Sequence, residues 1–257
     1  MLFSNYYVLY KLILNDLKKQ YLGSVLGFIW AFVQPLINII VIWFVFQVGF
    51  RATDIGNVPY ILWLISGLIP WYFLSDAISK GTNVIVEYEF LVKKIIFNID
   101  YLPIVKIFSS FLIHSFFLIF LFFCFFFYYD SFTIYWFQIP FIILLSIFLL
   151  IGIIYITSSI NVFFRDMGQI VNMILQILFW ATPILWDINK VDIKYQFLLK
   201  LNPFFYIIEG FRYSLIYKKW IWEDSMFVFY FIPLVVMIFI VGRKFFKQLS
   251  SHFADVL

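Results

Sequence analysis

Residues 104–129 read IVKIFSSFLIHSFFLIFLFFCFFFYY, a run in which phenylalanine, leucine and isoleucine predominate. A helix needs about 20 consecutive, mostly apolar residues to cross a bilayer, so this run predicts a membrane-spanning helix. The rest of the 257-residue chain agrees, because 65% of its residues are apolar and only 12% are charged. Soluble domains average about 25% charged residues. We therefore expect lipid to surround most of the chain, which leaves no room for a separate soluble domain.

Five further segments on either side of this run also reach membrane-spanning length. Together the six predicted spans cover residues 27–50, 60–79, 104–129, 135–160, 170–186 and 226–242. An even number of spans places both termini on one side. Eleven of the 18 lysines and arginines lie on that side and seven on the other, so the positive-inside rule predicts cytoplasmic termini. The predicted fold class is all-α, with one transmembrane domain over residues 1–257.

Two segments outside these spans are amphipathic. Residues 1–26 lack the ordered features of a signal peptide; their apolar side chains recur at helical spacing between lysines, which predicts a cytoplasmic helix lying in the membrane interface. Residues 187–225 are too polar to span cleanly and are interrupted at Asn202-Pro203. They predict two short helices that re-enter the membrane from the outer face. The alternative is an external amphipathic loop on the lipid headgroups.

Sequence motifs for catalysis and metal binding are absent. There is no G-x-x-x-x-G-K-[ST] loop for a nucleotide and no H-E-x-x-H for zinc. His114 lies among phenylalanines and is more typical of a neutral, hydrogen-bonded packing residue than of a proton carrier. Asp76 is the only acid within the predicted spans and lies near the inner end of its span, so ion coupling has little support. We expect a transport subunit that is not an enzyme, holds no metal or cofactor, and receives its energy from a partner.

Short motifs with defined spacing occur over almost the whole chain. In order they are Asp16-Leu17-Lys18, Tyr21, Ser24-Val25-Leu26-Gly27, Trp30, Gln34-Pro35-Leu36, Gly67-Leu68-Ile69-Pro70-Trp71, Asn83, Leu91-Val92-Lys93-Lys94, Phe97, Leu102-Pro103, Phe164-Arg165-Asp166-Met167-Gly168, Pro183-Ile184, Asn202-Pro203 and Glu209-Gly210-Phe211-Arg212. Taken together, they resemble the ABC-2 type permeases, and in particular the branch that exports O-antigen, capsule and teichoic acid chains. One departure is Asn98-Ile99-Asp100, where the family often has Pro-Arg-Glu.

This resemblance implies a homodimer with one continuous pore at the dimer interface, in the inner membrane of a bacterium. It also implies two copies of a P-loop ATPase subunit on the cytoplasmic face, which would bind the ATP and Mg²⁺. The cargo would be a long glycan, such as the O-antigen of lipopolysaccharide, carried on undecaprenyl diphosphate or a related lipid. The net charge of +4 is small and scattered, which indicates lipid headgroups as neighbours and not nucleic acid.

Two charged cytoplasmic segments are candidates for coupling to the ATPase. In the loop 80–103, residues 87–96 mix Glu87, Glu89 and Lys93 with apolar residues, which is typical of an amphipathic helix that docks in a groove of another protein. The second segment is Arg165-Asp166, in the short turn between the fourth and fifth spans. The alternative for both is ordinary loop charge near the headgroups.

The candidate substrate channel is the polar face of the first span. Trp30, Gln34 and Asn38 follow one another at four-residue spacing and so share one helix face. A polar face inside a membrane must contact water or another helix, so it predicts either the pore or dimer interface, or simple interhelical hydrogen bonds. Tyr72 and Trp180 are further channel candidates because aromatic rings can pack on the faces of sugars.

Other aromatic and polar residues have less specific interpretations. Tryptophans near span ends ordinarily form interface belts, and this is the interpretation favoured for Trp43, Trp63, Trp136, Trp220 and Trp222. The candidate external gate consists of Asn202, Pro203, Glu209 and Arg212.

Three other functional classes remain open. They are an ABC-2 exporter of a small molecule or another lipid, a membrane-embedded glycosyltransferase or acyltransferase, and a passive scaffold subunit. The transferase would require paired carboxylates or a catalytic histidine beside a span, and the spans offer neither.

Overall fold

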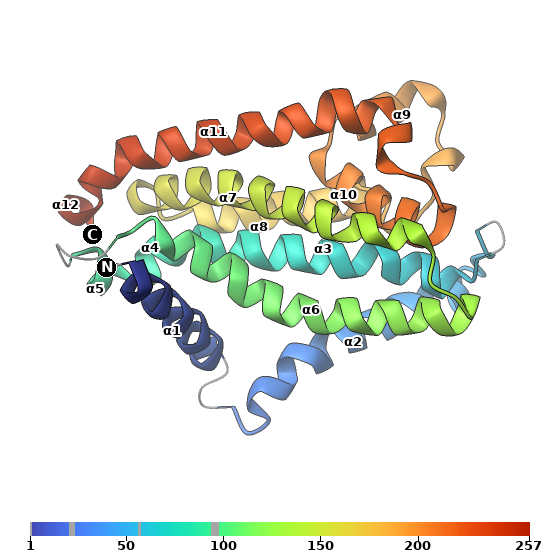
Figure 1. Ribbon diagram of the computed structural model, residues 1–257, viewed down its shortest axis with the longest axis horizontal. Helices are drawn as coiled ribbons and strands as arrows, with labels where there is room; N and C mark the ends of the chain where they lie inside the picture. Colours follow the sequence, from blue (N-terminus) through green and yellow to red (C-terminus); the bar gives the residue numbers. More distant parts are fainter. Residues whose placement is uncertain (1, 21–23, 56–57, 94–97) are drawn as a thin grey trace.

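A computed structural model of the chain describes residues 2–20, 24–55, 58–93 and 98–257. Within these described residues, five long apolar helical runs could each cross a membrane: Gly27–Gly49, Tyr60–Thr82, Tyr101–Tyr129, Ile134–Phe163 and Phe227–Val256. Figure 1 shows them as a bundle, with shorter helices at both ends. The all-helical fold class is confirmed. Tyr21, Lys94 and Phe97, which belong to the motifs above, lie outside the described residues.

The helices of the bundle have the following bounds. They are α2 (Trp30–Trp43), α3 (Tyr60–Thr82), α6 (Tyr101–Tyr129), α7 (Ile139–Phe163), α8 (Met167–Ala181) and α11 (Ile232–Leu249). The shorter helices are α1 (Leu2–Gln20), α4 (Val84–Glu87), α5 (Glu89–Val92), α9 (Ile193–Lys200), α10 (Pro203–Arg212) and α12 (Phe253–Val256).

The predicted fifth span, residues 170–186, differs from the structure. Helix α8 begins earlier, at Met167, and ends at Ala181 after 15 residues. It ends there because Thr182 precedes Pro183 and adopts extended backbone angles, as residues before proline usually do. At 1.5 Å per residue, α8 is about 22 Å long, shorter than the roughly 30 Å hydrocarbon core of a bilayer. It is an apolar helix, but it is not of full spanning length.

The predicted last span, residues 226–242, is longer in the structure. The helical run continues from Phe227 to Val256, and Pro233 lies in the first turn of α11. Pro233 cannot donate a backbone hydrogen bond, and it lies just after the π-helical turn Phe227–Phe231 with which this run begins.

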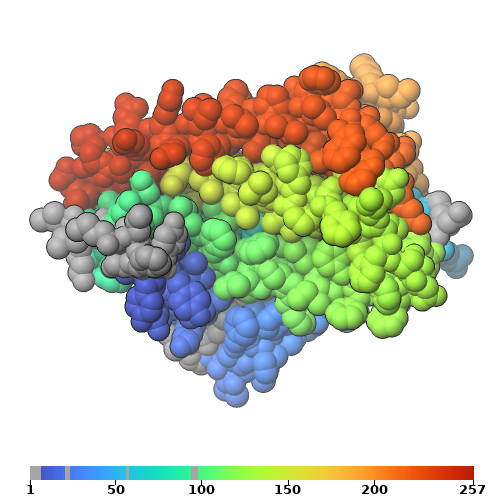
Figure 2. Space-filling model, in the orientation of Figure 1, coloured from blue at the N-terminus to red at the C-terminus, as the bar shows by residue number. Residues whose placement is uncertain are grey.

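Helix α3 is the centre of the bundle. In its membrane-length window 78% of the residues are buried, against 11% for the helix that includes α2. Helices α6, α7, α8 and α10 pack around α3, whereas α2 lies at one edge of the molecule (Figure 2). Trp30, Ile37, Ile40 and Val41 of α2 are accordingly between 42% and 60% exposed.

Helices α7 and α11 pack closely along their length. A Cβ atom added to Gly152 of α7 would lie 2.7 Å from the carbonyl oxygen of Ile238 of α11, closer than real side chains approach a backbone. The same is true of Gly242 against the backbone of Gly152. The two glycines therefore permit the close approach of the two helices.

The two ends of the bundle carry different elements. Helix α1 begins near α4, α5 and α12 at one end, called here the α1 end, while α9 lies at the other, the α9 end (Figure 1). The region 187–225 contains the two short helices predicted from sequence, α9 and α10. Every residue of α10 from Phe204 to Arg212 is buried, whereas much of α9 is exposed.

Candidate functional site

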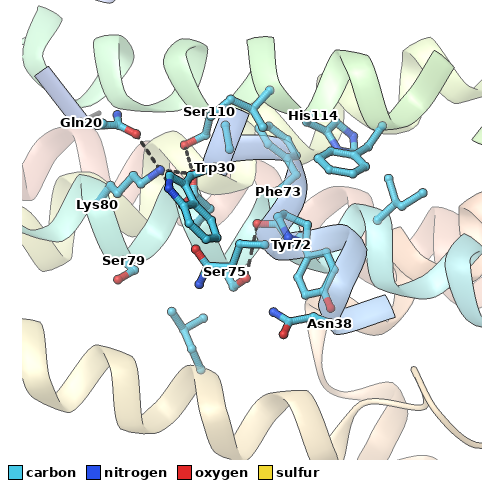
Figure 3. A pocket seen from close by; sticks show the side chains of 18 of the residues that line it. Gln20, Trp30, Asn38, Tyr72, Phe73, Ser75, Ser79, Lys80, Ser110 and His114 are labelled. Carbon is cyan, nitrogen blue, oxygen red and sulfur yellow. Dashed lines mark hydrogen bonds and ion pairs between the residues drawn. The ribbon is translucent and has the colours of Figure 1, made fainter. Parts of the chain in front are cut away.

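A cleft of about 620 Å³ opens between α2, α3, α6 and α8, on the side of the bundle where α2 lies. Figure 3 shows the side chains that line it. The lining residues are Gln20, Trp30, Ala31, Gln34, Pro35, Asn38, Ile69, Tyr72, Phe73, Ser75, Asp76, Ser79, Lys80, Ser110, Ile113, His114, Phe117, Asn172 and Leu175.

The α2 wall of the cleft carries the polar face expected from sequence. Trp30, Gln34 and Asn38 all line the cleft. Pro35 lies within α2 and cannot donate a backbone hydrogen bond to the carbonyl of Ala31 four residues earlier. Both Pro35 and Ala31 also line the cleft. This wall thus offers one indole ring and two amides.

The α3 wall adds rings and hydroxyl groups. Tyr72, another predicted channel residue, lines the cleft, and the Ser75 hydroxyl donates a hydrogen bond of 3.3 Å to its carbonyl. The structure thus brings four of the five channel candidates to one cleft. The fifth, Trp180, does not line it. It lies in the last turn of α8 with 58% of its surface exposed, and its carbonyl accepts a hydrogen bond from the Trp186 indole.

His114 of α6 also lines the cleft. Its ring stacks on that of Phe73 at 4.7 Å between centroids, and only 4% of the residue is exposed. The sequence predicted a neutral, hydrogen-bonded packing residue. Within the described part of the chain, however, Nε2 has no hydrogen-bond partner.

Charged groups occur only at the α1 end of this lining. The Lys80 ammonium lies 2.7 Å from Asp76, one helical turn away on α3. The Ser110 hydroxyl of α6 donates to Asp76 at 2.6 Å, and Lys80 donates to Gln20 of α1 at 2.9 Å (Figure 3). Asp76 and Lys80 are the only carboxylate and ammonium among the described lining residues, and they neutralise one another.

The first predicted coupling segment covers residues 87–96, and its described part, residues 87–93, is not one continuous helix. It forms α4 and α5, which are separated at Tyr88, where ψ is 30°. Glu89 and Lys93 pair at 2.6 Å within α5, whereas Glu87 forms ion pairs outside the segment. Tyr88 breaks the helix because its ring turns inward and its hydroxyl donates a hydrogen bond to the buried Asp16.

Asp16 of α1 is the centre of a buried polar cluster that the sequence analysis missed as a site. The Lys106 ammonium lies 2.6 Å from it, and Ser109 and Tyr88 donate to it at 2.7 and 2.8 Å. Burial by itself raises the pKa of Asp16, but the Lys106 charge and the hydrogen bonds outweigh burial and hold this pKa below its ordinary value of 3.8. Lys106 also pairs with Glu87 at 2.8 Å. Lys106 lies in the first turns of an apolar run, where a charged side chain needs a partner. Its position in the sequence therefore indicated a nearby carboxylate.

The second predicted coupling segment, Arg165-Asp166, is an exposed turn between α7 and α8. The buried Asn161 amide holds its position. The Asn161 side chain donates to Asn83 and accepts from the backbone N–H of Gly168, both at 3.2 Å. A Cβ at Gly168 would lie 2.8 Å from the Asn83 oxygen, so a larger residue would displace this contact.

The two coupling segments lie near each other at the α1 end. The hydrogen bond and charge of Lys93 lower the pKa of Glu89 below 4.5, and the charge of Arg165 contributes in the same direction. Glu89, Lys93 and Arg165 therefore lie close enough for their charges to interact, and these three residues together with Glu87 and Asp166 are called here the coupling surface.

The predicted gate residues at the start of α10 connect it to the end of α8. The Asn202 oxygen accepts from the Phe204 N–H and thus caps α10, while its amide donates to Thr182 at 2.7 Å. Pro203 occupies the first turn of α10, where its missing N–H costs nothing.

Arg212, at the other end of α10, is buried and binds the same turn. It donates to the carbonyls of Pro183 and Ile184 at 2.6 and 3.0 Å, and to Glu209 at 2.8 Å. Its guanidinium also lies 3.5 Å from the centre of the Trp63 ring. Hydrogen bonds therefore connect both ends of α10 to residues 182–184.

The tryptophans assigned to interface belts occupy different environments. Trp222 is 58% exposed and stacks on Trp220 at 4.4 Å. Trp63 and Trp136 are buried inside the protein, with exposed fractions of 0% and 7%. The belt assignment is therefore wrong for these two, because proximity to a span end does not show which way a side chain points.

Comparison with known proteins gives one family and several relatives. A family model described as ABC-2 type transporter matches residues 7–216. Two proteins of Klebsiella pneumoniae, both named O-antigen export system permease protein RfbA, are 27% and 28% identical to this chain over 245 residues, which is 95% of this chain and 92% of each relative. A protein of the same name from Myxococcus xanthus is 28% identical over 198 residues, covering 76% of this chain and 75% of that relative.

Proposed function

This chain belongs to the ABC-2 type transporter family, as a multi-pass, non-catalytic permease subunit, and we propose that its cargo is a lipid-linked polysaccharide of the O-antigen kind. The lining of the cleft is the observation that supports this cargo. It combines the rings of Trp30, Tyr72 and Phe73 with hydroxyl and amide groups, and its one carboxylate and one ammonium are paired. Sugars present C–H faces that pack on rings and hydroxyls that hydrogen-bond to neutral polar groups, so this lining suits an uncharged glycan.

The proposed topology has six crossings with both termini in the cytoplasm of a bacterial cell. The positive-inside bias of the sequence supports it, and so does the common position of α1, α4, α5 and α12 at one end (Figure 1). In this arrangement α1 lies in the cytoplasmic interface of the inner membrane. The short helix α8 makes the fifth crossing together with the turn 182–184, and α10 re-enters at membrane depth, where α3 and α7 cover it.

The proposed assembly is a homodimer that packs along α2. Helix α2 has little contact with its own chain, and one of its faces lines the open cleft. A second copy placed against this edge would bring the two clefts together into one pore. The external gate would then be α10 with Asn202, Pro203, Glu209 and Arg212.

The proposed partner is a P-loop ATPase subunit, in two copies, which supplies the ATP and Mg²⁺ sites. It would bind the coupling surface, where exposed charges of both signs lie together. Such a surface can dock into a groove of complementary charge.

The test is to purify the chain from its native membranes and to measure which subunit accompanies it and what stimulates ATP hydrolysis. We expect a P-loop ATPase in equal amount and stimulation by lipid-linked glycan. Trp30→Ala in the cleft should reduce this stimulation, whereas Trp222→Ala on the exposed outer surface should not. Stimulation by small amphiphiles but not by the glycan would favour an exporter of small molecules or lipids instead.

A further inference from the structure

The last turn of α1 contains a side chain that connects two charged groups. The Gln20 amide nitrogen donates to one Asp16 oxygen at 2.8 Å, and its amide oxygen accepts from the Lys80 ammonium at 2.9 Å. Figure 3 shows Gln20 reaching the cleft beside Lys80. A glutamine can do this because one end of its amide donates and the other accepts. Gln20 thus joins α1 to α3, although 60 positions separate it from Lys80.

From Asp16 the contacts continue to the coupling surface. The second Asp16 oxygen binds the Lys106 ammonium at 2.6 Å, and Lys106 in turn binds Glu87 at 2.8 Å. Lys19 of α1 also approaches Glu87, at 3.5 Å. Glu87 is the last residue of α4 and remains one-third exposed, so it is within reach of a docked partner.

From Lys80 the contacts continue into the cleft. Lys80 binds Asp76, and the Ser110 hydroxyl of α6 donates to the same carboxylate at 2.6 Å. All three side chains line the cleft. The result is one unbroken series of hydrogen bonds and ion pairs from the coupling surface to the cleft wall. It consists of Glu87, Lys106, Asp16, Gln20, Lys80, Asp76 and Ser110, and is called here the α1 network.

We infer that Asp16 and Gln20 of α1 are the positioning residues that couple the partner-binding surface at Glu87 to the cleft wall at Lys80 and Asp76. This role rests on the proposed function, since it assumes that the ATPase acts at the coupling surface and the cargo in the cleft. Charge-assisted hydrogen bonds between partly buried groups are strong and directional. A displacement of Glu87 therefore shifts Lys106 and α1, and Gln20 passes the shift to α3.

The two halves of the α1 network differ in burial, and this difference determines what each does. Asp16 and Lys106 have side-chain exposures of 0% and 3%, so this ion pair keeps α1 bound to α6 throughout the transport cycle. Lys80 and Asp76 are 28% and 37% exposed, which places their contacts beside the open cleft. Their contacts, and the Gln20 contact to Lys80, can therefore be exchanged during a transport cycle at small cost.

The test uses the complete transporter, with its ATPase subunit, in nanodiscs, and compares Gln20→Leu with Ser109→Ala. Ser109 also donates to Asp16 but lies outside the series, so it is a matched control. We expect Gln20→Leu to retain its melting temperature and its ATPase subunit. Its stimulation by lipid-linked glycan should fall on the order of fivefold or more, the usual size of coupling between two sites. Ser109→Ala should keep its stimulation.

A second variant, Lys80→Met, tests whether the effect of Gln20→Leu acts through the α1 network. If Gln20 acts through Lys80, then Lys80→Met should reduce stimulation by a similar factor, and the double variant should be no worse than either single one. Fully multiplicative effects, or unchanged stimulation in Gln20→Leu, would overturn the inference while leaving the exporter intact. A parent complex that does not respond to the glycan at all would overturn the proposed function, and the inference with it.

Discussion

The Lys106 ammonium lies 2.6 Å from the Asp16 carboxylate, although 90 positions separate the two residues in the chain. Both side chains are almost completely buried. Tyr88, Ser109 and Gln20 also donate hydrogen bonds to the Asp16 oxygens. A buried charge pair of this kind is not necessarily more stable than an apolar pair of the same size, but it fixes the geometry of the elements that carry it. Here it fixes α1 against α6 and against the loop that contains α4 and α5.

Removal of the Lys106 charge should destabilise the protein strongly. Lys106→Met leaves the Asp16 carboxylate buried without its counter-charge, which costs about 3–5 kcal/mol of unfolding free energy. The double variant Lys106→Met with Asp16→Asn should recover part of this loss. Lys93→Ala is the control, because the Lys93–Glu89 pair is exposed and contributes little to stability. Thermal unfolding of the purified protein measures all three, and equal losses for Lys93→Ala and Lys106→Met would contradict the prediction.

The pH dependence of this pair follows from the lowered pKa of Asp16. In the unfolded chain the carboxylate binds a proton near its ordinary pKa of 3.8, whereas in the fold it does so only at lower pH. The stabilisation is therefore fully present above this ordinary value and is lost as the pH falls through the folded-state pKa. The stability difference between the parent protein and Asp16→Asn should stay constant from pH 8 to pH 5 and shrink in stronger acid. A difference that disappears between pH 8 and pH 6 would show that another group controls it.

The sequence predicted the long helices because hydrophobicity and length alone define a membrane span. It did not predict their ends well. Helix α8 ends at Ala181 because of Pro183. The predicted span continued past this proline because the residues on either side of it are apolar. The break between α4 and α5 could not be predicted locally, because Tyr88 turns toward Asp16, 72 positions away.

The cleft was predictable only in part, for a similar reason. Trp30, Gln34 and Asn38 share one face of one helix, so their four-residue spacing was sufficient to group them. Gln20 and Lys80 meet across two helices, and no periodicity within either helix indicates this contact. Trp180 is an aromatic residue of the type expected in the channel, but it is exposed and does not line the cleft.

The glycine contact between α7 and α11 should not tolerate even a methyl group. Gly242→Ala places a Cβ against the backbone of Gly152, which cannot move aside as a flexible side chain could. The helices must separate, and we expect a loss of about 1–3 kcal/mol or more in unfolding free energy. Gly49→Ala is the matched control, because a Cβ at Gly49 has no atom within 4 Å. Comparable melting temperatures for the two variants would contradict the close packing of α7 and α11.

The exposed turn between α7 and α8 should be required for transport and not for folding. The Asp166 side chain makes no capping hydrogen bond to α8, so Asp166→Ala should leave stability and membrane insertion unchanged. If the turn receives the movement of the ATPase, this variant should hydrolyse ATP without exporting cargo. Asp192→Ala, an exposed acid just before α9, is the control and should export normally. Normal export by Asp166→Ala would remove this turn from the coupling surface.

Arg212 should not be replaceable by lysine, although the charge would be kept. Its planar guanidinium donates to two carbonyls and to Glu209 at the same time, and its central carbon lies 3.5 Å from the centre of the Trp63 ring. A lysine ammonium is a point charge without this geometry. Arg212→Lys should leave at least one of these buried acceptors unpaired, at a cost of about 1–3 kcal/mol.

Hydrogen exchange measured segment by segment shows whether Arg212 holds α10 to the turn 182–184 or supports the whole bundle. Both ends of α10 hold the turn 182–184, so Arg212→Lys should increase hydrogen exchange in that turn and in α10 first. Lys218→Ala is the control, because Lys218 contacts only the Tyr129 ring among the interactions described for it and does not contact the turn. Its exchange pattern should match the parent. Increased exchange in Arg212→Lys that is spread evenly over α3, α6 and α7 would mean that Arg212 supports the whole bundle and does not specifically hold α10 to the end of α8.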